Sequence, residues 1–161
     1  SFMTDVRLPI LSEHEIKSFF LKAKQSDRKR FPKILHAKGD YKNKVINFVL
    51  KDSYMKPHLH PGVEKIENMY LLKGSFALIL FDDNGEITET ILLEKGKKET
   101  IHVPAFTWHT YIMLSNEVVI YETMDGVYDP LTWKKMAPWA PEENEKLAKK
   151  YLYALKKKIA L

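Results

Sequence analysis

The sequence contains no cysteine among its 161 residues. This excludes a disulfide framework, a cysteine nucleophile and a thiolate metal site, so any metal must be bound by His, Asp or Glu. No hydrophobic run approaches the roughly 20 residues that a membrane-spanning helix requires. The start, SFMTDVRLPI, lacks the apolar segment of a signal peptide, and Ser1 and Phe2, which precede a methionine, are treated as an expression remnant. We therefore expect a soluble cytoplasmic protein with no membrane partner.

The body of the chain also lacks net charge. Residues 1–133 contain 18 basic and 18 acidic residues, whereas residues 134–161 contain eight lysines and three acidic residues and account for the whole net charge of +5. A short basic run is weak evidence for an anionic partner, and a lysine-rich helix face in solvent is the better explanation. We therefore expect no nucleic-acid partner.

The length and a hydrophobic content of 45% fit one compact domain. Ser12 and Glu15 form a capping box, which predicts a helix over residues 13–25. A second helix is expected from near Pro141, because proline suits a first helical turn. Between them, seven short β-rich runs separated by turn residues predict a mainly β sandwich or barrel: KVINFVL, MYLLKG, SFALILF, ITETILL, TIHVP, HTYIML and EVVIYET.

Within that one domain we expect three segments. Residues 1–27 would form an N-terminal helical segment, 28–130 the β-barrel, and 131–161 a proline-rich connection followed by the basic C-terminal helix. No nucleophile elbow, phosphate-binding loop or dinucleotide fingerprint is present. Any chemistry must therefore come from another arrangement of side chains.

Three of the six histidines have spacings that favour a metal site. His58 and His60 are two residues apart in a strand-like segment, so both rings project from the same face. The Pro61-Gly62 turn, with positive φ available to the glycine, returns the chain and brings Glu67 beside them. His109 begins a later strand. Such a set of ligands suits one divalent ion of iron, manganese, nickel, cobalt or zinc, and leaves two positions open on an octahedral ion.

The first of these segments resembles the first motif of the cupins. In HLHPGVEKIENMYLLKG, six residues separate Glu67 from Gly74, as the motif requires. Glu64 fits the commoner spacing from His60, but only Glu67 keeps the spacing to a glycine. We therefore prefer Glu67 as the carboxylate ligand.

The segment PAFTWH, residues 104–109, resembles the second cupin motif and ends at His109. Phe106 stands where that motif usually has glycine, so we expect a differently built turn and a phenyl ring that narrows the pocket. The resemblance implies a cupin double-stranded β-helix, which is a jelly-roll barrel, with one bound divalent metal.

A closer resemblance, over roughly residues 28–143, is to the WbuC family of cupin-fold metalloproteins. It is carried by SYMKPHLHP, FDDNGEI, VPAFTWHTYI and YETMDGVYDPLTWKKMAPWAPEE. Members of that family are typically associated with clusters for O-antigen or other surface polysaccharides, and the resemblance implies no particular reaction. Because cupin sandwiches often pair through their sheets, it also implies a homodimer.

Other residues are candidates for the pocket around the metal. Glu122 is a candidate general base or partner of a metal ligand. Arg28 and Arg30 can clamp an anionic substrate through bidentate hydrogen bonds. The remaining candidates for substrate binding are Asn47, Tyr54, Met69, Phe106, Trp108, Tyr111 and Tyr128. Core packing or a solvated surface position is the alternative for each of these residues, and His102 is expected to be an ordinary strand residue.

We predict a metal-dependent enzyme that acts on a small polar substrate, such as a sugar or sugar nucleotide of surface-polysaccharide biosynthesis. Isomerisation or epimerisation by proton transfer fits such a site, and so does oxygen-dependent cleavage if the metal is iron. A non-catalytic module that binds a carbohydrate or another small ligand is the alternative. A purely structural metal is a further one.

Overall fold

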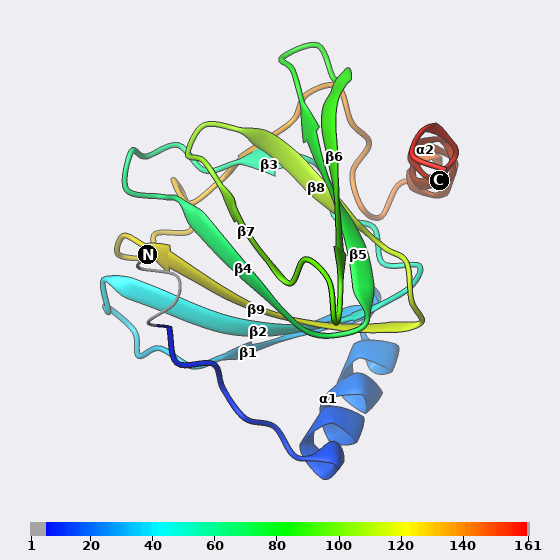
Figure 1. Cartoon of the computed structure of the whole chain (residues 1–161). Helices are drawn as coiled ribbons and strands as arrows, with labels where there is room; N and C mark the ends of the chain where they lie inside the picture. Colours follow the sequence, from blue (N-terminus) through cyan, green and yellow to red (C-terminus); the bar gives the residue numbers. More distant parts are fainter. Residues whose placement is uncertain (1–5, 161) are drawn as a thin grey trace.

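The computed structural model describes residues 6–160, whose strands form two five-stranded antiparallel sheets (Figure 1). Ser1 and Phe2, which the sequence analysis treated as a remnant, lie outside the described residues. In strand order, the first sheet consists of β1 (Arg30–Ile34), β2 (Lys42–Leu50), β9 (Glu117–Asp125), β4 (Glu67–Lys73) and β7 (Thr100–Val103). The second consists of β10 (Lys135–Met136), β3 (His58–Leu59), β8 (Trp108–Met113), β5 (Ser75–Phe81) and β6 (Ile87–Glu94).

All seven expected strand runs are strands, and their ends agree within two residues. Strand β1, which the sequence did not predict, contains Pro32. It pairs only with β2 and so forms an edge of its sheet, where the missing N–H of a proline does not interrupt a ladder on both sides.

The hydrophobic core lies between the two sheets and combines side chains such as Met69 and Leu71 from one with Phe76 and Leu78 from the other. The continuous apolar run of β9 is buried on both faces, because helix α1 (Glu13–Gln25) covers the outer face of that sheet. This helix has the bounds and the capping box that the sequence predicted.

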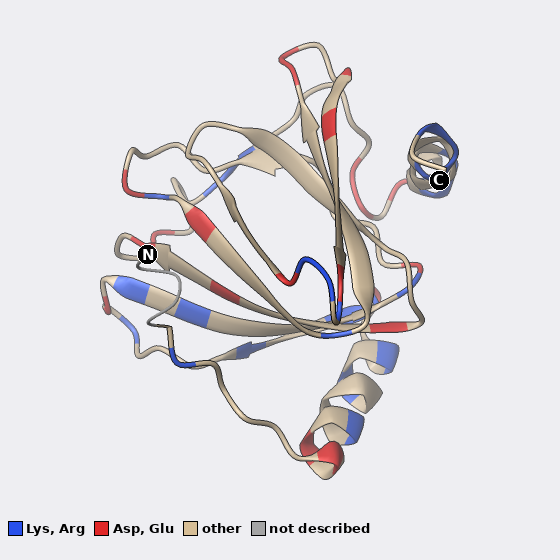
Figure 2. Cartoon of the chain, viewed as in Figure 1, with Lys and Arg blue, Asp and Glu red and all other residues tan. Residues whose placement is uncertain are grey.

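The second helix begins later than expected. Helix α2 covers Leu147–Lys158, whereas the residues after Pro141 form turns. The reason is that two glutamates of this stretch are held by the barrel: Glu142 pairs with Lys56 and Glu143 with Arg30. Helix α2 then packs on the outer face of the second sheet through Ala148, Leu152 and Leu155, which leaves its lysines along the outside (Figure 2).

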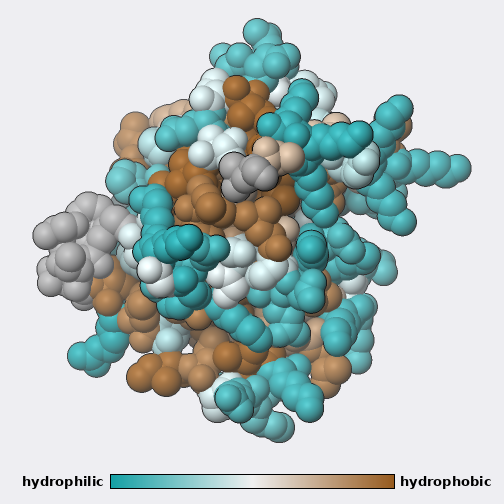
Figure 3. All heavy atoms as spheres, turned by 45° about the vertical axis from the view of Figure 1, so that its right-hand side comes forward, coloured by the Kyte–Doolittle hydropathy of each residue, from teal (hydrophilic) through white to brown (hydrophobic). Residues whose placement is uncertain are grey.

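Figure 3 turns the side of α2 forward and shows hydrophobic side chains gathered between hydrophilic ones. Exposed hydrophobic residues of the described chain include Leu92 on β6 and Tyr153 on α2. Neither of the described helices is long and apolar enough to span a membrane.

Candidate metal centre and its cavity

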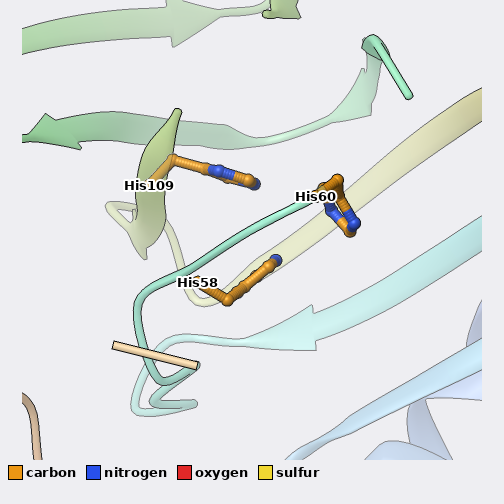
Figure 4. A group of neighbouring side chains, drawn as sticks. All are labelled: His58, His60 and His109. Carbon is orange, nitrogen blue, oxygen red and sulfur yellow. The ribbon is translucent and has the colours of Figure 1, made fainter. Parts of the chain in front are cut away.

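Three histidines meet in the space between the sheets. His58 on β3 lies directly across the ladder from His109 on β8, and His60 follows two residues after His58. One ring nitrogen from each lies within 4.8 Å of the others, and the rings point toward one another (Figure 4). Each side chain is at most 5% exposed. The predicted grouping of the three histidines is thus present.

The backbone sets the orientation of each ring. In all three histidines Nδ1 lies within hydrogen-bond distance of a main-chain carbonyl oxygen: His58 with Lys56 at 3.0 Å, His60 with Trp133 at 2.9 Å, His109 with Thr107 at 2.8 Å. Because a carbonyl oxygen only accepts, Nδ1 carries the hydrogen, and in the neutral ring Nε2 keeps its lone pair free. Burial, and then the charge of His109, lower the pKa of His58 well below its ordinary value. A neutral imidazole is the form that binds a metal.

The Nε2 atoms of His60 and His109 are buried and have no hydrogen-bond partner in the described part of the chain. The nearest carboxylate is that of Glu67, the first residue of β4, at 3.4 Å from the first nitrogen and 3.7 Å from the second. Burial tends to raise the pKa of Glu67, but the two histidines beside it lower it well below its ordinary value. Unpartnered nitrogens beside an ionised carboxylate fit a divalent cation.

Glu67 reaches this position because the turn before β4 reverses the chain, with the Lys65 N–H donating to the Gly62 carbonyl oxygen at 2.9 Å. Gly62 does not have the positive φ that the sequence suggested. Space is the constraint instead, since a Cβ there would lie 3.0 Å from the side chains of Glu64 and Lys65. Glu64 is exposed on this turn, so the geometry favours Glu67 as the carboxylate beside the histidines.

Phe106 adopts the left-handed conformation of the glycine that it replaces, with φ of 60°. This places its N–H 3.0 Å from the carbonyl oxygen of His60, to which it donates. The ring is 56% exposed and does not line the cavity. The expectation that it narrows the pocket is therefore wrong, because the backbone of this corner, and not the ring, faces the histidines.

A cavity of about 270 Å³ opens beside His60 and Glu67. Its inner wall includes His60, Glu67, Tyr111, Glu122 and Asn47. The amide of Asn47 donates to the carboxyl group of Glu122. Burial, and then the charge of Glu67, raise the pKa of Glu122 well above its ordinary value, so it keeps its proton to a higher pH than an exposed glutamate.

Of the predicted pocket residues, the cavity wall includes Asn47, Tyr111, Glu122, Tyr128 and Arg30. Three others lie elsewhere. The Tyr54 hydroxyl donates to the Pro141 carbonyl oxygen at 2.8 Å, and Met69 is buried in the core between the sheets. Trp108 precedes His109 on the same strand and therefore points to the opposite face, where its indole N–H donates to Asp83 at 2.9 Å.

Arg30 lines the cavity, but its guanidinium already has protein partners. It donates to both carboxylate oxygens of Glu143, at 3.1 and 2.9 Å, and to Ser53 and the Tyr54 carbonyl oxygen, each at 3.2 Å. The predicted substrate clamp at this residue is therefore replaced by a structural link between β1 and the segment before α2.

Several wall residues were not predicted from the sequence, among them Trp133 and Lys134. The carbonyl oxygen of Trp133 holds His60, and its ring packs against Tyr128 with centroids 5.3 Å apart. The only signal for them was their place in the YETMDGVYDPLTWKKMAPWAPEE segment. Nothing in their residue type indicated that this segment passes over the mouth of the cavity.

A family model described as a domain of unknown function, DUF6016, matches residues 11–93. No curated protein matches the sequence.

The structure resembles protein SO0799 from Shewanella oneidensis, with a TM-score of 0.59 and 12% identity over 74% of this chain and 82% of that one. It also resembles KdgF from Halomonas sp., with a TM-score of 0.50 and 19% identity over 63% of this chain and 83% of that one. CapF, solved with 3-isopropenyl-tropolone, gives a TM-score of 0.55 and 16% identity over 64% of this chain but only 30% of that longer one. At such identities the likeness shows the fold, a mainly β cupin-like sandwich with terminal helices, as predicted.

Proposed function

We propose that this chain, which belongs to the family of the domain of unknown function DUF6016, is a metal-dependent enzyme that acts on a small polar substrate. The observation that carries the proposal is the pair of buried Nε2 atoms, on His60 and His109, that have no partner within residues 6–160. A buried polar atom without a partner is costly, and a cation would satisfy both atoms at once.

The proposed ligands of one divalent ion are His58, His60, His109 and Glu67, and iron, manganese, nickel, cobalt and zinc all suit this set. When bound, the ion would supply a Lewis acid that polarises a carbonyl group or binds two substrate oxygens. The main-chain carbonyl groups that hold Nδ1 of each histidine fix the rings in place for this role.

Proton transfer is the reaction type that the cavity favours. Glu122 lies on the inner wall beside Glu67, with its carboxyl group oriented by Asn47. Because of this position we assign it the exchange of a proton with a substrate in the cavity, as in an isomerase or epimerase. Oxygen-dependent cleavage remains the alternative for an iron-loaded protein.

A sugar or sugar nucleotide of surface-polysaccharide biosynthesis is the proposed substrate, and the resemblance to the WbuC family supports it. The cavity, at about 270 Å³, is near the small end of the usual range for ligand sites. It suits a sugar-sized group, so the nucleotide of a sugar nucleotide would extend beyond the mouth. The proposed compartment for this reaction is the cytoplasm.

Metal analysis of histidine variants tests the centre. After incubation with each metal in turn and removal of the excess, we expect the wild type to hold about one equivalent, and His109→Ala to hold none. His102→Ala is the matched control, because His102 is exposed on β7 and faces away from the cavity. Full occupancy of the His109→Ala protein would refute the ligand assignment.

Incubation in D₂O tests the reaction. The metal-loaded protein is incubated with sugar phosphates and nucleotide sugars, and the recovered compounds are examined by mass spectrometry for deuterium at carbon. We expect incorporation with the wild type and at least a hundredfold less with Glu122→Gln at unchanged metal content. Saturable thermal stabilisation by a compound, without deuterium or product, would favour the non-catalytic binding module.

A further inference from the structure

The cavity wall includes three cationic side chains, those of Arg28, Arg30 and Lys134, and the two that are exposed, Arg28 and Lys134, mark its mouth. They differ in how their donors are used. Arg30 is 6% exposed and its guanidinium donates to Glu143 and to the main chain. Its charge is therefore already compensated by Glu143.

The other two cations keep free donors. Arg28 uses only Nε, which donates to the same Glu143 at 3.0 Å, and its two terminal nitrogens bond to nothing in the described chain. The ammonium group of Lys134 has neither a hydrogen bond nor an ion pair with any residue from 6 to 160. One carboxylate, that of Glu143, thus pairs with two guanidinium groups, while a third cation of the same cavity wall has no partner among residues 6–160.

These charges act on one another. Burial, and then the charges of Arg28 and Arg30, lower the pKa of Lys134. Lys134 lines the same cavity as the two arginines and His60.

Three cations that share one carboxylate carry excess positive charge, which attracts an anion, and free N–H donors bind carboxylate and phosphate oxygens strongly. We propose that the ligand of this cavity is a small organic anion, whose carboxylate or phosphate group is bound by Lys134 and Arg28. The rest of the molecule extends inward, past Trp133 and Tyr128, toward Glu122 and the histidines. This inference rests on the proposed function and specifies the charge of its substrate.

Paired probes of equal size test the inference. The binding of D-glucose, D-glucuronate and glucose 6-phosphate to the metal-loaded protein is measured by titration calorimetry at low and at high salt. We expect at least one of the two anions to bind at least tenfold more tightly than glucose, with an advantage that decreases as salt is added. Preference for glucuronate or for the phosphate distinguishes the two anionic groups. Equal binding of all three compounds, or no binding of the anions, would overturn the inference.

Two neighbouring lysines provide the matched variants. Lys134→Met should weaken the binding of the preferred anion by roughly tenfold or more, because a charged hydrogen bond is lost. Lys135→Met removes the same charge one residue further, where the ammonium lies over the Trp108 ring outside the cavity, and should leave the affinity within about twofold. Equal losses in the two variants would show a general effect of charge and contradict the inference.

The metal-free protein separates this inference from the proposed function. If the chain holds no metal, the proposed function fails, but the anion titrations can still be run on the same protein. A preference for anions that Lys134→Met removes would then support the inference alone. Metal binding without any preference for anions would overturn the inference and leave the proposed function intact.

Discussion

Two buried polar clusters border the same cavity and differ in how their atoms are satisfied. The histidine cluster consists of His58, His60, His109 and Glu67, and the Nε2 atoms of two of its histidines have no hydrogen-bond partner among the described residues. The arginine cluster consists of Arg30 with Glu143 and their main-chain partners, and its terminal nitrogens all have partners.

The difference distinguishes a binding site from a structural link. In the arginine cluster the protein supplies both charges, so the cluster is complete and joins β1 to the segment before α2. In the histidine cluster each Nδ1 is hydrogen-bonded to a main-chain carbonyl oxygen, and the lone pairs of the neighbouring Nε2 atoms remain free. A buried cluster whose polar atoms all have protein partners contributes to stability. A buried cluster with unpartnered polar atoms is expected to bind a ligand.

The largest expected effect comes from completing the histidine cluster. At a free metal concentration of 1,000 times Kd, the metal should stabilise the wild type by about 4 kcal/mol, because it binds the folded state alone. Thermal unfolding with and without metal measures this gain. We expect no gain in His58→Ala and an unchanged gain in Arg30→Met, and equal gains in both variants would contradict the distinction between the clusters.

Breaking the arginine cluster should be the next largest effect. Arg30→Met leaves buried partners uncompensated and should lower the free energy of unfolding by about 3 kcal/mol. Arg28→Met also removes a partner of Glu143, but Arg28 is 53% exposed, so its loss should cost less than about 1 kcal/mol. Urea denaturation measures both. The assignment of Arg30 as the structural partner would be wrong if the two variants lost the same stability.

Acid should weaken the arginine cluster through Glu143. Burial tends to raise the pKa of Glu143, but the charge of Arg30 lowers it below the ordinary value of 4.5. Below pH 4.5 the unfolded state therefore binds a proton that the folded state does not, and stability falls as the pH decreases toward the folded pKa. Between pH 5 and 3 the free energy of unfolding should therefore depend less steeply on pH in Arg30→Met than in the wild type. The difference in slope should correspond to up to about one bound proton. An unchanged slope would show that Arg30 does not set this pKa.

The smallest effect is expected at the corner beside His60. Phe106→Gly relieves a left-handed conformation that costs a side chain about 1 kcal/mol, but glycine also increases the entropy of the unfolded chain. The two contributions oppose each other, so stability should change by less than about 1 kcal/mol. The N–H that donates to His60 is kept, so metal affinity, measured by calorimetry, should change less than threefold. A larger change in affinity would mean that the ring itself positions the histidine cluster.

Much of the fold followed from the pattern of the chain. The β-rich runs between turn residues predicted seven strands, and Ser12 with Glu15 predicted the first helix, because these signals are local. The start of α2 was misplaced because Glu142 and Glu143 bind partners that are distant in sequence. A local preference of proline for the first turn is weaker than two ion pairs with buried cations of the barrel, Lys56 and Arg30.

The candidate site divides in the same way. The grouping of His58, His60 and His109 followed from spacing, since two residues on one strand face must point the same way. Trp108 was wrongly predicted to line the pocket. Its side chain lies on the face of β8 that packs against α2, and the sequence does not show which face of β8 that is. The homodimer expected from the resemblance stays a prediction, which light scattering of the purified protein can test.

The sequence by itself determined which residue types can bind a metal, because without cysteine only histidine and carboxylate side chains remain. The spacing of these residues is also a property of the sequence. Only the tertiary structure decided which cations are free at the mouth of the cavity. Arg30 and Lys134 have the same charge, but Arg30 meets Glu143, 113 residues away, while Lys134 meets no counter-charge in the described chain. Partners so far apart are chosen by the path of the whole chain, which no local pattern contains.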